Sequence, residues 1–255
     1  SESGKNMIIS KVNQAVQGEL KIDSISMGWL KGIKITNLNF SDKKGCTQIT
    51  ANQLAARPRY LDLLAGRISI GQAVINEPKI FVDISGRCDE KDEKIIKIDE
   101  EKKSQPAVVL SRSPAELLAV ANIDLTVRNG DCKFIAPDVN NDIKTLELRS
   151  INSTLALRPL GKESSFDVSL AVASANEVSQ VNTSGFIKTS EKGWSFKDTS
   201  GQLDLKVTDL DLATLGPLFK VLDVNLTAAG TINAVVDTKI QKGQFENLNG
   251  KVSAK

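Results

Sequence analysis

The chain has 255 residues, of which 40% are hydrophobic and 25% charged, a composition typical of a folded globular protein. Its 33 basic and 31 acidic residues give a formal net charge of +2 and are spread along the sequence. The chain therefore lacks the concentrated basic stripe of a nucleic-acid-binding protein, and nucleic acid is not a predicted partner. The sequence contains no run of about 18 apolar residues, so it predicts no transmembrane helix.

The sequence offers no recognisable catalytic machinery. It contains no histidine, which removes the commonest general base and the commonest metal ligand. Phosphate-binding glycine loops and calcium-loop patterns are absent, and the carboxylates fall on the polar positions of predicted strands or in a charged segment. Cys46, Cys88 and Cys132 lie more than forty residues apart and form no metal or redox motif. We therefore predict no enzyme, no cofactor and no metal site.

The N-terminal region predicts one short helix followed by short strands. Apolar residues at helical spacing over 5–17 predict an amphipathic helix that closes at Gly18. Alternating apolar residues then predict separate short strands at residues 20–22, 33–35 and 38–40, with a hairpin turn at 42–45.

The pattern continues as strand from 46 to 56, followed by one or two helical turns over 58–66. Residues 67–85 predict two strands broken by Pro78 at an edge or corner of the sheet. Between 86 and 103, thirteen of eighteen residues are charged, which is typical of a solvated linker rather than of a packed element.

The second half alternates more regularly. Strict period-two patterns at 123–127, 166–172, 203–207 and 224–226 predict strands with one apolar face. Helical turns are expected at 113–121 and 212–221. Glycines at 185, 201, 230 and 250 stand near predicted strand starts at uneven intervals, which favours a long antiparallel meander with variable hairpins.

Two sets of residues resemble one family. Residues 16–38, 61–70 and 76–80, and then 123–134 and 209–218, resemble AsmA-like proteins, a bacterial envelope family related to TamB and to the repeating β-groove lipid-transfer proteins. The resemblance implies a mainly β fold, with a long curled antiparallel sheet that forms an open groove, a short N-terminal helix and a few helical inserts. The charged segment 86–103 has no counterpart that we can map.

The resemblance also implies an organisation and a location. Residues 1–18 would be a helix that follows a removed membrane anchor, 19–85 an N-terminal β region, 86–105 a charged linker, and 106–255 a β-groove region truncated at its C-terminus. The full-length protein would be periplasmic and anchored in the bacterial inner membrane. Its partners would be phospholipid or another lipid, with other envelope proteins as further partners.

The expected function is to bind or conduct phospholipid along an apolar β-groove and so to support outer-membrane biogenesis. The residues expected to face the groove alternate along two strands: Phe166, Val168, Leu170, Val172, Leu203, Leu205 and Val207. Periodicity alone does not separate an open groove from a closed core between two sheets. The alternatives are therefore a structural or adhesive β-sandwich array that binds protein or glycan and, as a third class, a carbohydrate-active enzyme on a β scaffold.

Overall fold

A computed structural model describes residues 9–10, 13, 18–28, 31–59, 70–86, 122–138, 140–174, 178–191, 196–221 and 228–254. Its twelve strands are β1 (Gly18–Gly28), β2 (Gly32–Asp42), β3 (Thr47–Pro58), β4 (Ile70–Asn76), β5 (Lys79–Asp83), β6 (Ile123–Pro137), β7 (Ile143–Leu157), β8 (Glu163–Ala173), β9 (Val178–Lys188), β10 (Ser200–Asp211), β11 (Thr231–Gln241) and β12 (Gln244–Ala254). Three short helical segments accompany them: η2 (Phe196–Asp198), η3 (Leu212–Leu215) and α4 (Gly216–Val221).

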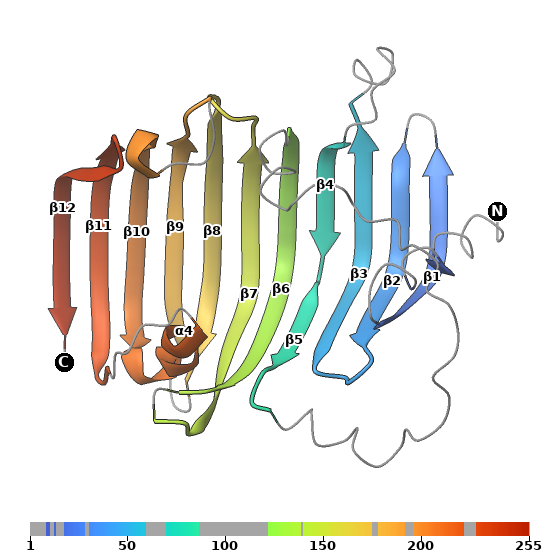
Figure 1. Cartoon of the computed structure of the whole chain (residues 1–255), viewed down its shortest axis with the longest axis horizontal. Coiled ribbons are helices and arrows are strands. Elements are labelled where there is room, and N and C mark those ends of the chain that lie inside the picture. Colours follow the sequence, from blue (N-terminus) through green and yellow to red (C-terminus); the bar gives the residue numbers. More distant parts are fainter. Residues whose placement is uncertain are drawn as a thin grey trace, which may run out of the picture.

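All twelve strands belong to one sheet with the order β1-β2-β3-β4-β6-β7-β8-β9-β10-β11-β12 (Figure 1). Strand β5 occupies the same place in that order as β4, since both pair with β3 and with β6. The mainly β fold with one long sheet and little helix is thus confirmed. The described strands form no second sheet. A closed sandwich would need a second sheet packed against one face of this sheet, and none of the described strands lies there.

The sheet is mixed rather than purely antiparallel. Strands β4 and β5 both run parallel to β6, whereas every other neighbouring pair is antiparallel. A parallel neighbour requires a connection of about a dozen residues or more, and the chain between Asp83 and Ile123 has that length. The predicted N-terminal and C-terminal β regions therefore meet in one continuous sheet at the contact of β4 and β5 with β6.

Residues that face one another across the strands form rows, and consecutive rows point to opposite faces because side chains alternate along a strand. One row crosses the whole sheet on the apolar face: Ile25, Ile35, Leu54, Ile75, Val127, Ser153, Val168, Thr183, Leu205, Val236 and Gly250. The adjacent row is mostly polar: Ser26, Lys34, Ala55, Val74, Thr126, Thr154, Asp167, Ser184, Asp204, Asp237 and Asn249. One face is therefore mostly apolar over about 48 Å, at ~4.8 Å per strand spacing.

Several strands contain one residue in the left-handed backbone region, and the apolar positions change parity there. These residues are Asn37, Asn129, Ser150, Asp209 and Asn247, with Glu77 between β4 and β5. The strand register shifts by one residue at most of them, as expected for β-bulges. Asn and Asp are the residue types that best tolerate this conformation apart from glycine.

The left-handed residue in β2 corrects one prediction. The change from Ile33 and Ile35 to Leu38 and Phe40 was expected to separate two short strands, but both pairs belong to the single strand β2. Asn37 has a φ of 50° between them, and its amide donates to Asp23 Oδ2 on β1 at 2.7 Å. A left-handed residue changes the parity of the apolar positions without ending the strand.

Pro78 breaks the segment 67–85 into two strands as predicted, but it does not lie at an edge. It sits inside the sheet between β3 and β6, at the break between β4 and β5. The neighbouring backbone groups still pair: Glu77 N–H donates to Arg128 O and Asp131 N–H donates to Pro78 O, both at 2.8 Å. On β6, Gly130 leaves room for the proline ring, because an added Cβ would lie 3.0 Å from Pro78 Cγ.

The core lies at one end of the central strands. Leu146, Val172, Val207, Leu210 and Ala234 are buried together, and Leu215 of η3 packs against them. Helix α4 contacts β6 and β7 and lies in front of the lower ends of the central strands in Figure 1. The helical turns predicted at 212–221 are thus confirmed.

The hairpin turn at 42–45 is also confirmed, with Gly45 N–H donating to Asp42 O at 3.1 Å. Other predictions concern residues outside the described part of the chain: most of the helix at 5–17, the helical turns at 58–66 and 113–121, the strand at 224–226, the charged segment from 87 onward, and Cys88.

Candidate functional site

The structure brings the seven predicted groove residues together on the apolar face. Phe166, Val168, Leu170 and Val172 lie on β8, and Leu203, Leu205 and Val207 lie on β10, with β9 between the two strands. The register places Phe166 and Leu203 opposite the same β9 residue, and likewise Val168 with Leu205 and Leu170 with Val207. They form two parallel lines of large side chains.

Small side chains lie between these two lines. The β9 residues on the apolar face are Ser179, Val181, Thr183 and Gly185. Gly185 stands between Phe166 and Leu203, where a Cβ would collide with the carbonyl oxygen of Gln202 and lie 3.1 Å from Phe166 Cζ. From Ser179 to Gly185 this line of small residues extends for roughly 20 Å, at about 3.4 Å per residue.

One end of this strip is closed. Val172 and Val207 are 3% and 8% exposed, and both belong to the buried core beside η3. Ser179 at the same end is 1% exposed, and its hydroxyl donates to Asp209 O at 2.6 Å. These residues stabilise the fold, so the surface available to a ligand lies toward the other end.

The other end is only partly covered. Phe166, Val168, Leu203 and Leu205 are half-buried, as are Leu170 and Val181. Elsewhere on the apolar face, large side chains are more than a third exposed: Met27, Ile33, Ile80, Ile187, Phe245 and Val252. Exposed apolar surface of this kind is a sign of a binding surface when it is contiguous.

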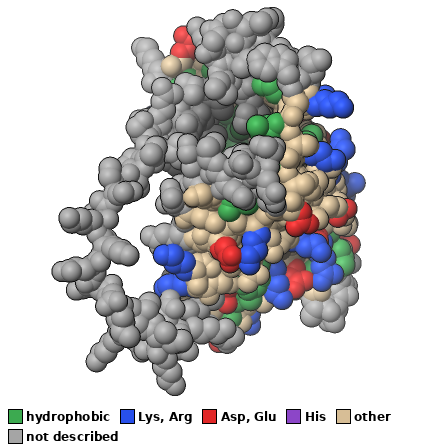
Figure 2. Space-filling model, turned by 90° about the vertical axis from the view of Figure 1, so that its right-hand side faces the viewer, with side chains coloured by type: hydrophobic (Ala, Val, Ile, Leu, Met, Phe, Trp, Pro, Cys, Tyr) green, Lys and Arg blue, Asp and Glu red, His purple; other side chains and the backbone are tan. Residues whose placement is uncertain are grey.

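The opposite face carries the charges. In Figure 2, which views the molecule from its β1 end, Lys, Arg, Asp and Glu side chains gather along the right-hand side. On this face Asp204 of β10 and Asp237 of β11 stand directly opposite one another. The facing Asp237 carboxylate raises the pKa of Asp204, while Gln202 Nε2 donates to both carboxylates at 3.3 and 3.4 Å.

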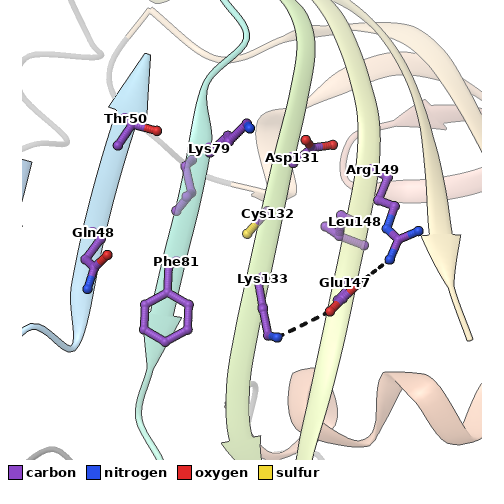
Figure 3. Close-up of a pocket in the computed structure, with 11 residues that line it drawn as sticks. Gln48, Thr50, Lys79, Phe81, Asp131, Cys132, Lys133, Glu147, Leu148 and Arg149 are labelled. Carbon is purple, nitrogen blue, oxygen red and sulfur yellow. Dashed lines mark hydrogen bonds and ion pairs between the residues drawn. The ribbon is translucent and has the colours of Figure 1, made fainter. Parts of the chain in front are cut away.

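The polar face also contains an open pocket of about 340 Å³ over β3, β5, β6 and β7 (Figure 3). Glu147 pairs there with Arg149 at 2.7 Å and with Lys133 at 3.4 Å. The hydrogen bond from Arg149, helped by Lys133, holds the pKa of Glu147 below its usual range. Burial raises the pKa of the Cys132 thiol, and the register places Cys132 in one row with Ile80 and Leu148, which points to the apolar face.

Sequence reasoning missed this pocket because its residues come from four strands. One signal was available: Phe81 stands between Ile80 and Val82 and so falls on a polar position of an alternating strand. Phe186 of β9 also occupies a polar position of its strand, so this signal alone does not single out the pocket.

Within the described residues, no three His, Cys, Asp or Glu side chains are grouped as metal ligands would be. None of the described helices has the length and apolar character of a membrane span.

No family model matches the sequence, and no curated protein matches it.

Proposed function

We propose that this protein binds lipid, with acyl chains lying against the apolar face of the sheet and polar headgroups remaining in water. In this proposal it is a binding protein rather than an enzyme. It acts as a periplasmic, inner-membrane-anchored AsmA-like protein that binds or conducts phospholipid in support of outer-membrane biogenesis.

The observation that carries the proposal is the exposure of the apolar face. A sheet of twelve strands presents contiguous apolar rows, and none of the described strands forms a second sheet over them. Met27, Phe245 and Val252 remain 68%, 61% and 60% exposed. Covering such surface is worth about 25 cal/mol per Å², so a ligand that is itself apolar gains affinity without needing directional contacts.

The strip formed by β8, β9 and β10 has the form that an acyl chain requires. Two lines of large side chains, about 9.6 Å apart across two strand spacings, border the small residues Gly185 and Thr183. Each methylene buried there contributes about 0.8 kcal/mol. A chain would enter from the half-buried end at Phe166 and Leu203, because the Val172 end is closed by the core.

The same surface suits movement as well as binding. The row through Val168 and Leu205 crosses every strand position from Ile25 to Gly250 and is apolar at all of them except Ser153, Thr183 and Gly250. Hydrophobic contact is non-directional, so no single position on the row is strongly preferred. A lipid that leaves the central strip still meets apolar side chains on the neighbouring strands, which supports the conducting role implied by the AsmA-like resemblance.

Native mass spectrometry of the purified protein, followed by lipid extraction, tests the proposal. Phospholipid should remain bound to the wild-type chain, and Phe166→Gln on the apolar face should reduce the bound fraction. Phe186→Gln is the matched control, because Phe186 is also half-buried but lies on the polar face of the adjacent strand. Reproducible absence of lipid, or an equal loss in the two folded variants, would contradict lipid binding by this face.

A further inference from the structure

The pocket on the polar face is built from two rows of side chains that cross four strands. Facing residues in the first row are Gln48, Phe81, Lys133 and Glu147. The second row contains Thr50, Lys79 and Asp131, with Arg149 of β7 beside it. The rows span roughly 14 Å across the strands and lie about 7 Å apart along them, and they lie on the face opposite the proposed lipid surface.

Phe81 gives this pocket an aromatic surface. Its neighbours in the row are polar or charged, and Ile80 and Val82 on either side of it point to the apolar face. The ring is half-buried and is seen face-on among the polar side chains in Figure 3. A half-buried aromatic ring surrounded by hydrogen-bonding groups offers a ligand one flat apolar contact and several directional hydrogen bonds.

The surrounding polar groups are suited to hydroxyl groups and to one negative charge. Gln48, Thr50 and Asp131 offer an amide, a hydroxyl and a carboxylate. Glu147 is occupied by Lys133 and Arg149, whereas Lys79 is exposed and forms no ion pair with a described residue. Three cationic side chains against two carboxylates leave the lining positively charged.

We propose that this pocket binds an acidic sugar, meaning a saccharide unit that carries a carboxylate or a phosphate. The apolar C–H face of the sugar ring stacks on Phe81, the hydroxyl groups bond to Gln48 and Asp131, and the acidic group pairs with Lys79. Sugars are the ligand class that combines a flat apolar face with a ring of hydroxyl groups. A fatty acyl chain would leave the polar groups unsatisfied, and a free anion would make no use of the aromatic ring.

Titration of the isotopically labelled protein, followed by backbone amide NMR, tests the proposal. The probes are glucose, glucuronate, glucose 6-phosphate and inorganic phosphate. Glucuronate and glucose 6-phosphate should shift the amides of Phe81, Lys79 and Cys132 at lower concentration than glucose does. Shifts produced equally by inorganic phosphate would reveal a simple anion site and overturn the proposal, as would the absence of shifts with every sugar.

Variants separate the aromatic contact from the charge. Phe81→Ala should weaken binding of both acidic sugars at least tenfold, whereas Phe81→Trp should retain it and Phe186→Ala, the matched control on the same face, should leave it unchanged. Lys79→Gln should remove the advantage of the acidic sugars over glucose, while Lys206→Gln should not. Equal affinity of Phe81→Ala and wild type for the acidic sugars would overturn the proposal. If Phe81→Ala fails to fold, the affinities of Phe81→Trp and Lys79→Gln still test it.

The outcome does not depend on the lipid proposal. Phe81→Ala should retain as much phospholipid as wild type, because Phe81 lies on the opposite face. Loss of sugar binding with normal lipid retention would support both assignments, and loss of lipid alone in Phe166→Gln would leave the sugar site intact.

Discussion

Asp204 and Asp237 face each other on adjacent strands, and this arrangement has a cost at neutral pH. Like charges directly opposite in a sheet are destabilising. The facing carboxylate raises the pKa of Asp204 in the folded protein. Asp204 therefore releases its proton at a lower pH in the unfolded chain than in the folded protein. The folded state is therefore progressively penalised above the ordinary aspartate pKa of about 4.

Asp204→Asn should therefore raise the melting temperature at pH 7 and have little effect near pH 3, where both states hold the proton. Thermal unfolding across this pH range measures the difference. Asp167→Asn is the control, because Asp167 lies in the same row but faces Ser184 and Thr154 rather than a carboxylate. An increase at pH 7 that is the same for both variants would show that the facing pair is not its cause.

Asp209 holds a left-handed backbone conformation with a φ of 51°. Its carboxylate accepts from Asn233 Nδ2, and its N–H donates to Asn233 Oδ1, both at 2.9 Å. Asp209→Ala should lower the free energy of unfolding by about 1–2 kcal/mol, whereas Asp209→Asn should stay within about 0.5 kcal/mol of wild type. Urea denaturation provides the values, and equal stability of the two variants would be inconsistent with a strained position.

For single residues, the sequence predicts which side chains of a strand are apolar better than it predicts where the backbone is left-handed. The alternating residues at 166–172 and 203–207 predicted the apolar face correctly because neither stretch contains a left-handed residue. In β2 and β6 the parity of the apolar positions changes at Asn37 and Asn129. Asparagine is common in loops and turns, so its presence alone does not indicate a change of parity within a strand.

The pairing of β9 with β10 requires a close approach of their backbones at Gly185. Gly185→Ala would force a Cβ against the carbonyl oxygen of Gln202, which is backbone and cannot rotate away. We expect a loss of about 1–3 kcal/mol in unfolding free energy. Gly250→Ala on β12 is the matched control, since its nearest contact would be Val235 O at 3.4 Å. Equal unfolding free energies of the two variants in chemical denaturation would refute the close approach at Gly185.

The two ends of β10 should differ in their contribution to stability. Leu210 is 8% exposed and lies in the core, so Leu210→Ala should cost about 2–5 kcal/mol. Leu203 is half-buried beside Gly185, and Leu203→Ala should cost clearly less. Equal losses in calorimetric or denaturant unfolding would mean that both ends are core, and the half-buried end would no longer be available to a lipid.

At the scale of the whole molecule, the sequence predicted a single long sheet but not its complete topology. Period-two patterns specify which face of a strand is apolar, yet they do not specify the neighbour of that strand. The parallel contact of β4 and β5 with β6 joins segments about fifty residues apart, so no local pattern announces it. The pocket around Phe81 depends on this contact, which explains why the sequence pointed to the apolar strip on β8, β9 and β10 and not to the pocket.

The central claim is that acyl chains lie on one face of this sheet. A phospholipid with a photoreactive diazirine in its acyl chain, irradiated with the folded protein and mapped by tandem mass spectrometry, tests it most directly. Adducts are predicted on apolar-face residues of β8 and β10, above all Phe166, Val168, Leu203 and Leu205. Adducts confined to the polar-face positions between them, such as Asp167 and Lys206, or no adducts above the unirradiated sample, would contradict it.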